Sequence, residues 1–234
     1  EIKKIIKYLK KNKIYLIDTA RSYGESEKYF DDKKFMVISK LKKLDGDNNV
    51  SSIEDKILKS INTSYKNLGK EKIHSLLIHN WAEYKLFRKK ILKILLRKKK
   101  QNVLNSIGAS VYHPKEAYEV IEEKNFTHLQ FPFNILDQRF NNKNFIKKAV
   151  GRKKKIYTYA RSIFLQGLLL NKNTKPKNLK LKNVRLKIDL IKRLLKVKNN
   201  LDLCLKYINS FIWIDYFVVG VENCKQLDQI SNFY

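Results

Sequence analysis

Short apolar runs alternate with amphipathic stretches along the whole chain. Seven of these runs are largely apolar, are bounded by polar residues, and predict β-strands. They cover residues 14–17, 35–38, 75–78, 106–111, 129–133, 156–159 and 217–219. Because consecutive rather than alternate positions are apolar, we expect strands that are buried on both faces, as in a parallel sheet.

Helical periodicity occupies much of the sequence between these runs. The chain opens with Ile2, Ile5 and Leu9, whose spacing places them on one face of a helix. Residues 171–183 are polar and Lys-rich and include Pro176, so we expect a long loop there. Further helices are predicted over 51–68, 86–95, 145–150 and 201–211, from Pro114, and from about Asn223.

This alternation is typical of two α/β architectures, the open doubly wound sheet and the TIM barrel. No G-x-G-x-x-G occurs among the seven glycines, which counts against a dinucleotide-binding Rossmann half. Seven strands in a chain that opens on a helix favour a (β/α)8 TIM barrel with seven strands visible and the first one missing. We expect a single barrel domain over residues 1–234, as a fragment truncated at both ends.

The composition narrows the class of protein. The 234 residues include 43% hydrophobic side chains, enough for one domain with a sizeable core. Cys204 and Cys224 lie far apart, which excludes a disulfide scaffold and a cysteine zinc site and favours a reducing, cytoplasmic compartment. No apolar run reaches the length of a membrane helix, so we expect no membrane partner.

The net charge of +29 raises the question of nucleic-acid binding. The basic residues are spread over every segment, and only eight of the 51 are Arg, the better ligand for phosphates and base edges. We therefore expect a solvated, Lys-rich surface and no specific nucleic-acid partner. The oligomeric state stays open.

Polar residues stand where three successive predicted strands end. Asp18 follows the first visible strand, Lys40 the second, and His79 the third. In a TIM barrel the carboxyl ends of the strands carry the active site, and a charged residue after a buried run is costly unless it is paired. With Tyr23 five residues after Asp18, these four side chains are expected to converge on one pocket.

These residues lie in stretches that resemble the aldo-keto reductase family over nearly the whole chain. The most specific stretch is Ile17-Asp18-Thr19-Ala20 followed by Tyr23-Gly24-Glu25-Ser26-Glu27. Residues 160–167 are similar to a bacterial branch often found near surface-polysaccharide genes. Shorter stretches follow in the family's order at 39–40, 77–80, 107–110, 130–134, 167–169 and 219–221.

The resemblance implies a catalytic tetrad. Tyr23 would be the general acid that protonates the carbonyl oxygen, and Lys40 would lower the pKa of Tyr23, which is ~10 in a free tyrosine. Asp18 would pair with Lys40, and His79 would orient the carbonyl by a hydrogen bond. Glu25 and Glu27 are interpreted separately, as early-helix residues favoured by the helix dipole.

The resemblance also implies NADPH or NADH as the cofactor that supplies the hydride, and no metal. Ser110 and Gln130 would bind the carboxamide, and Arg161 would stack on the nicotinamide, where many family members have an aromatic residue. Gly220 and Val221 would lie near the adenine-side phosphates. Glu222 stands where a basic residue often holds the 2′-phosphate, so the choice of cofactor stays open. The expected cofactor-binding residues are Ser110, Gln130, Arg161, Ser162, Gly220 and Val221.

The leading interpretation is an NAD(P)H-dependent oxidoreductase that reduces a small-molecule aldehyde, ketone or sugar-like carbonyl. The alternative is a cofactor-binding regulatory or inactive barrel protein without turnover. A basic nucleic-acid-binding protein ranks last. Trp81 comes just after His79, and we interpret it as a packing residue rather than part of the substrate site.

Overall fold

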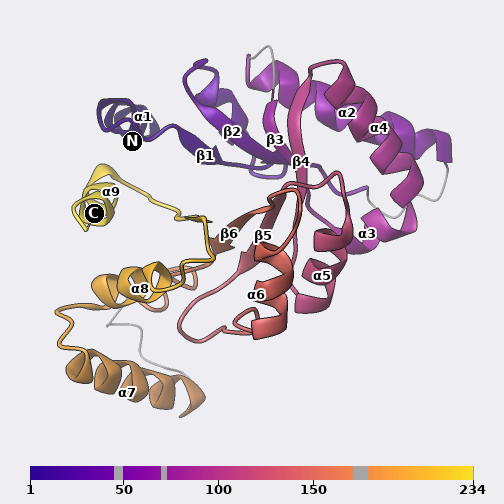
Figure 1. Ribbon diagram of the computed structural model, residues 1–234. Coiled ribbons are helices and arrows are strands. Elements are labelled where there is room, and N and C mark those ends of the chain that lie inside the picture. Colours follow the sequence, from indigo (N-terminus) through magenta and orange to yellow (C-terminus); the bar gives the residue numbers. More distant parts are fainter. Residues whose placement is uncertain (45–49, 70–72, 171–178, 234) are drawn as a thin grey trace.

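Seven parallel strands form the centre of the molecule. The structure, a computed structural model, describes residues 1–44, 50–69, 73–170 and 179–233 (Figure 1). Each predicted strand is confirmed, with ends that differ by no more than two residues. The strands are β1 (Leu16–Asp18), β2 (Met36–Lys40), β3 (Ile73–Ile78), β4 (Leu104–Ser110), β5 (His128–Pro132), β6 (Tyr157–Arg161) and β7 (Tyr216–Phe217).

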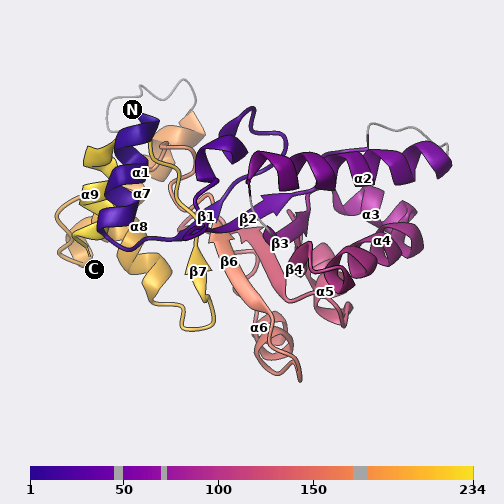
Figure 2. The ribbon, with the colours of Figure 1, turned by 90° about the horizontal axis from the view of Figure 1, so that it is seen from above.

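The order of the strands decides between the two predicted architectures. Neighbours in the sheet are neighbours in sequence, from β1 to β7, and every pair is parallel. A doubly wound sheet reverses its strand order, whereas a barrel does not. The sheet curls into a half-barrel, as Figure 2 shows from above. Among the described residues no strand pairing joins β7 to β1, so the ring stays open at that point.

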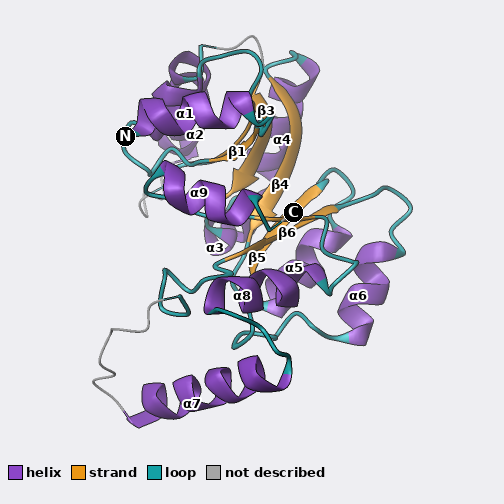
Figure 3. Cartoon of the chain, turned by 90° about the vertical axis from the view of Figure 1, so that its left-hand side faces the viewer, coloured by secondary structure: helices purple, strands orange, loops and turns teal. Residues whose placement is uncertain are grey.

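Helices lie around the outside of the curled sheet (Figure 3). The helices predicted at the start of the chain, over 51–68, 86–95, 145–150 and 201–211, from Pro114 and from about Asn223 are all present. Within the described residues none of the helices is long and apolar enough to cross a membrane. The helices are α1 (Ile2–Lys11), α2 (Val50–Asn67), α3 (Trp81–Leu86), α4 (Arg88–Lys100), α5 (Pro114–Glu122), α6 (Lys143–Val150), α7 (Leu179–Leu194), α8 (Asn200–Asn209) and α9 (Cys224–Ser231), with a 3₁₀ helix η1 (Ser26–Phe30). Helix α7 stands apart from the strands, beyond α8 (Figure 3).

The prediction of a loop over residues 171–183 is wrong for the last five of these residues. Helix α7 begins at Leu179, and residues 171–178 lie outside the described residues. Lys and Leu both favour helices, so the Lys-rich composition that we read as a loop is compatible with a helix that follows Pro176. Helix α3 was not predicted, because six residues are too few to show a helical period. The helix start expected at Glu25 and Glu27 is present as the 3₁₀ helix η1.

The core has an outer and an inner part, and the inner part positions the site. The outer core lies between the sheet and the helices and includes Val37 and Leu76. The inner cluster consists of the buried residues Ile38, Leu77 and Tyr159, with Leu16 packed against them. Because side chains alternate between the two faces of a strand, a residue two positions after an inner one points to the inside as well.

Candidate active site

Four residues of the inner cluster are each followed, two positions later, by a predicted site residue. Asp18 follows Leu16, and Lys40 follows Ile38. In the same way His79 follows Leu77, and Arg161 follows Tyr159. The alternation of the strands therefore directs these polar side chains to the carboxyl end of the barrel interior. The structure thus places these polar strand ends at one edge of the sheet.

Lys40 and Asp18 form the centre of the site. Lys40 is 1% exposed, and its Nζ donates to Asp18 Oδ2 at 2.6 Å and to the backbone oxygen of Thr19 at 2.8 Å. Burial lowers the pKa of Lys40, and the carboxylate of Asp18 opposes that shift. An ammonium removed from water in this way needs such a partner. The two residues are brought together as expected.

Ser110 and Gln130 extend this cluster along the sheet. Gln130 Nε2 donates to Asp18 Oδ1 at 2.8 Å, and Ser110 Oγ donates to Gln130 Oε1 at 2.9 Å. Both oxygens of Asp18 are therefore engaged, one by Lys40 and the other by Gln130. The cluster links the ends of β1, β2, β4 and β5 and holds Asp18 in a single orientation.

Tyr23 reaches the cluster from the loop after β1. Its amide donates to the backbone oxygen of Ala20 at 3.0 Å, which closes a turn, and Gly24 follows in the left-handed region with φ +58°. The ring centre lies 5.1 Å from Lys40 Nζ and 6.3 Å from the centre of the His79 ring. The structure thus brings all four residues of the predicted tetrad together. Tyr23 remains 51% exposed, at the open side of the cluster.

The pKa of Tyr23 departs from the expectation. Burial and the charge of Asp18 raise the pKa of the Tyr23 phenol, and the charge of Arg161 opposes them. The expected lowering of the pKa is not found, because burial and the charge of Asp18 outweigh the opposing positive charge. Tyr23 is consequently protonated at neutral pH, the state that a proton donor needs.

His79 is held in its neutral form. Burial and the nearby charges of Lys40, Lys43 and Arg161 lower the pKa of His79 to about 4. Its Nδ1 atom is buried, and no described residue hydrogen-bonds to it. A neutral imidazole has one donor and one acceptor nitrogen, so His79 can donate a hydrogen bond to an uncharged oxygen.

Arg161 closes the opposite side of the site. Its guanidinium carbon lies 4.1 Å from the centre of the Tyr112 ring, and Nη2 donates to the backbone oxygen of Val111 at 3.2 Å. The Nε atom is buried and has no partner among the described residues. Ser162 follows with φ 59°, and its backbone oxygen accepts from Asn134 Nδ2 at 3.1 Å. The sequence did not reveal Tyr112, because an exposed tyrosine after a strand carries no distinguishing pattern.

Gly220 and Val221 lie in the loop after β7. The amide of Val218 donates to the backbone oxygen of Ala160 at 2.7 Å, so this loop starts at the same edge of the sheet as Arg161. The space around Gly220 is open. Among the described residues no hydrogen bond joins Gly220 or Val221 to the tetrad.

Trp81 packs in the outer layer, as expected. It is buried and stacks on Tyr84 with ring centres 4.7 Å apart, and its Nε1 donates to Glu119 Oε2. This places it between helices rather than in the tetrad's opening.

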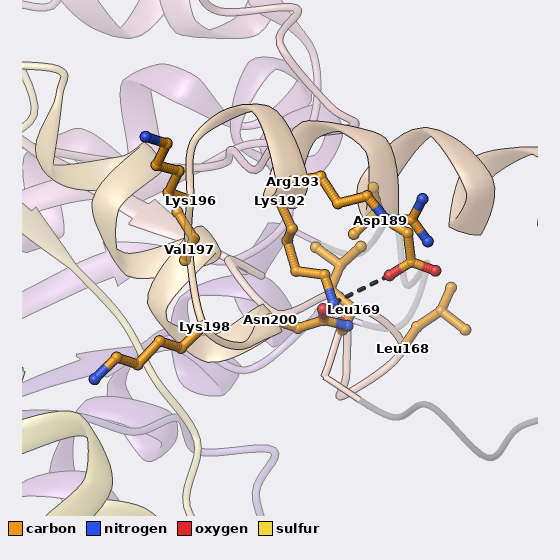
Figure 4. A pocket seen from close by; sticks show the side chains of 10 residues that line it. Leu168, Leu169, Asp189, Lys192, Arg193, Lys196, Val197, Lys198 and Asn200 are labelled. Carbon is orange, nitrogen blue, oxygen red and sulfur yellow. Dashed lines mark hydrogen bonds and ion pairs between the residues drawn. The ribbon is translucent and has the colours of Figure 1, made fainter.

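A surface cavity of about 560 Å³ lies away from the tetrad, between α7, α8 and the pair Leu168 and Leu169 (Figure 4). Lys192 Nζ pairs there with Asp189 Oδ1 at 3.0 Å. None of the four tetrad residues lines this cavity. The geometry of the candidate site is therefore carried by the strand ends and not by this cavity.

The aldo/keto reductase family model matches residues 1–234. This chain belongs to the aldo/keto reductase family. Members of this family use NADPH or NADH, the cofactors that the sequence led us to expect. No curated protein sequence matches the chain.

Solved structures of aldo-keto reductases have the same fold. The putative aldo-keto reductase PA4992 from Pseudomonas aeruginosa is 14% identical with a TM-score of 0.70, over 100% of this chain and 82% of that one. The holo form of aldo-keto reductase AKR11C1 from Bacillus halodurans is 15% identical with a TM-score of 0.76, over 98% and 79%. These likenesses confirm the predicted (β/α)8 barrel class.

Proposed function

We propose that this aldo/keto reductase is an NAD(P)H-dependent oxidoreductase that reduces an aldehyde, ketone or sugar-like carbonyl of a small molecule. The observation that carries the proposal is the buried pair of Lys40 and Asp18, at 2.6 Å, beside the half-exposed ring of Tyr23. A buried ion pair next to a protonated phenol and a neutral imidazole is suited to proton transfer onto an oxygen.

Each member of the tetrad has a separate role in this proposal. His79 donates a hydrogen bond to the substrate's carbonyl oxygen and fixes its direction. Tyr23 gives its phenolic proton to that oxygen as the carbon accepts a hydride. Lys40 then stabilises the phenolate that remains on Tyr23, and Asp18 holds Lys40 in place. The bound nicotinamide supplies the hydride.

The residues around the tetrad fit a nicotinamide cofactor. Two buried nitrogen atoms without partners among the described residues, Nδ1 of His79 and Nε of Arg161, belong to this end of the barrel, and a bound molecule can satisfy such atoms. We propose that Ser110 and Gln130 bind the carboxamide and that Arg161 stacks on the ring. Ser162, Gly220 and Val221 complete the proposed set.

The first test replaces the proposed acid. We expect Tyr23→Phe to lower kcat for carbonyl reduction by about 100-fold or more, since it removes the proton that general acid catalysis supplies. The absorbance of NADPH or NADH follows turnover on a panel of aldehydes, ketones and sugars. Dissociation constants for the cofactor, from the fluorescence of Trp81 and Trp213, should stay within about twofold of the parent. A variant that turns over as fast as the parent would sink the proposed mechanism.

A second candidate function is cofactor binding without turnover. The raised pKa of Tyr23 favours it, because a weaker acid transfers its proton less readily. Saturable binding of NADPH or NADH with no reduction across the same panel supports this alternative, whereas turnover that depends on Tyr23 rejects it.

The remaining proposals concern the whole chain. We propose that residues 1–234 form a single barrel domain. We also propose a cytoplasmic location, because Cys204 and Cys224 are both free thiols. No specific nucleic-acid partner is proposed, since the basic residues are spread along the whole sequence.

A further inference from the structure

A fully buried carboxylate follows Tyr23 in the same loop. Glu27 lies in the first turn of η1, and its side chain is 0% exposed. Ser39 Oγ donates to Glu27 Oε1 at 2.6 Å, and Asn67 Nδ2 donates to Oε2 at 3.1 Å. The interpretation of Glu27 as an early-helix residue is therefore right about its position but misses its burial.

The burial of this carboxylate costs free energy. An ionised carboxylate loses favourable hydration when it is removed from water. The cation that compensates it, Arg21 Nη1, lies 3.7 Å from Glu27 Oε2. A neutral side chain of similar size can fill the same space at a lower cost. The acidic group at this place therefore points to a role beyond filling space.

Glu27 joins the segments that carry Tyr23 and Lys40. Ser39 directly precedes Lys40 on β2, so the bond from Ser39 to Glu27 ties η1 to that strand. Asn67, at the end of α2, holds the second carboxylate oxygen and adds a third segment. One carboxylate thus connects the loop, the strand and the helix.

Thr19 connects the other end of the loop to the same strand. Its backbone oxygen accepts from Lys40 Nζ at 2.8 Å, and its Oγ1 lies 2.6 Å from Ser26 Oγ. The amide of Arg21 also donates to the backbone oxygen of Lys40, at 3.4 Å. The loop is therefore attached to β2 both before and after Tyr23.

The Tyr23 side chain depends on these attachments. Within the described part of the chain no hydrogen bond holds its hydroxyl group, and half of the side chain is exposed. Apart from the ring contacts with Lys40 and His79, its place is set by the backbone of the loop. A displacement of about 1 Å at a reacting group can lower a rate by about 100-fold.

We propose that Glu27 is a positioning residue for the reduction: it holds the loop so that the Tyr23 ring stays beside Lys40, and it touches neither substrate nor cofactor. This inference rests on the proposed function. It differs from a purely structural role because it predicts a slower proton transfer in folded enzyme.

The test is Glu27→Gln, which keeps the size of the side chain and removes its charge. The matched control is Glu25→Gln in the same loop, where the side chain is 68% exposed and pairs with Lys28. We expect Glu27→Gln to lower kcat by about 10- to 100-fold, with the cofactor's dissociation constant within about twofold of the parent. The solvent deuterium isotope effect on kcat should rise, because proton transfer becomes slower. Glu25→Gln should behave as the parent does.

A parental kcat in a folded variant decides against the inference. A lower Tm with an unchanged kcat and isotope effect means that Glu27 only stabilises the fold. If Glu27→Gln does not fold, Ser39→Ala is used instead, which removes one hydrogen bond and leaves the carboxylate. A parental kcat in Ser39→Ala then overturns the inference. A parent chain that reduces no carbonyl compound overturns the proposed function and this inference with it, whereas a turnover unaffected by Glu27→Gln overturns the inference alone.

Discussion

Burial keeps the side chains of two histidines, His79 and His128, in the neutral form. Burial, followed by the charges of Lys40, Lys43 and Arg161, lowers the pKa of His79 to about 4. Burial also lowers the pKa of His128 to about 4, although His128 stacks on Tyr159 at the opposite end of its strand from the tetrad. Burial thus keeps both side chains neutral, although His79 is a proposed hydrogen-bond donor and His128 is an ordinary packing residue.

The shifts predict an acid-sensitive fold. The folded pKa values lie below the ordinary value of 6.5, so between pH 6.5 and 4 the unfolded chain binds protons that the folded chain does not. The free energy of unfolding should therefore fall as the pH drops through this window. Between pH 7 and 4, the free energy of unfolding of His128→Phe should fall by about 2 kcal/mol less than that of the parent.

Urea unfolding at several pH values measures this difference. His113→Phe, at an exposed histidine, is the control for the substitution itself. An equal loss of stability in the parent and in His128→Phe would contradict the explanation by burial.

The sequence predicted the polar strand ends well, because side chains on one face of a strand recur at every second residue. Asp18, Lys40 and His79 each stand two residues after an apolar residue of the inner cluster, and that spacing is visible in the sequence. Tyr23 was placed with them by its position five residues after Asp18, whereas its role as the acid came from the family resemblance. The burial of Glu27 could not be predicted, since it depends on Ser39 and Asn67, which are distant in sequence.

At the scale of the elements, one glycine allows two strands to approach each other. Gly108 on β4 is paired in register with His128 on β5. A Cβ atom at Gly108 would lie 2.0 Å from the backbone oxygen of His128, which is shorter than any contact a side chain can make. The strand therefore requires glycine at this position.

We expect Gly108→Ala to lower the free energy of unfolding by about 3 kcal/mol or more, because the new methyl group must push β4 and β5 apart. Gly220→Ala is the control, since the space around Gly220 is open, and it should change stability by no more than about 0.5 kcal/mol. Thermal and urea unfolding compare the two variants. Equal stability of both would show that the strands can separate without cost.

The elements that the sequence missed have two separate causes. Helix α3 has six residues and begins where Asn80 accepts a hydrogen bond from the amide of Glu83, a local cap that precedes no clear apolar period. Helix α7 was hidden by its lysines, because the polar composition that favours solvent exposure also favours helices. Composition alone does not separate an exposed helix from a loop.

At the scale of the whole molecule, the order of the strands was predictable from the sequence. Seven strands in sequence order follow from the repeated strand–helix pattern. Over the residues that the structure describes, no strand pairing joins β7 to β1. The helices nevertheless meet across this gap: Tyr8 on α1 donates to Asp228 on α9 at 2.9 Å.

This contact makes the two ends of the polypeptide neighbours in space. The amide of Cys224 also donates to Glu1 Oε1 at 3.4 Å, and Figure 1 shows both ends on the same side of the molecule. We expect a circular permutant, joined by a short glycine-rich linker and reopened in the exposed bend between Lys153 and Lys154, to unfold cooperatively with a Tm close to that of the parent. Calorimetry decides this, and a permutant with no cooperative transition would mean that the chain must run from α1 to α9 in order to fold. A permutant that folds would show that the strands can take their places in the sheet whichever of them is synthesised first.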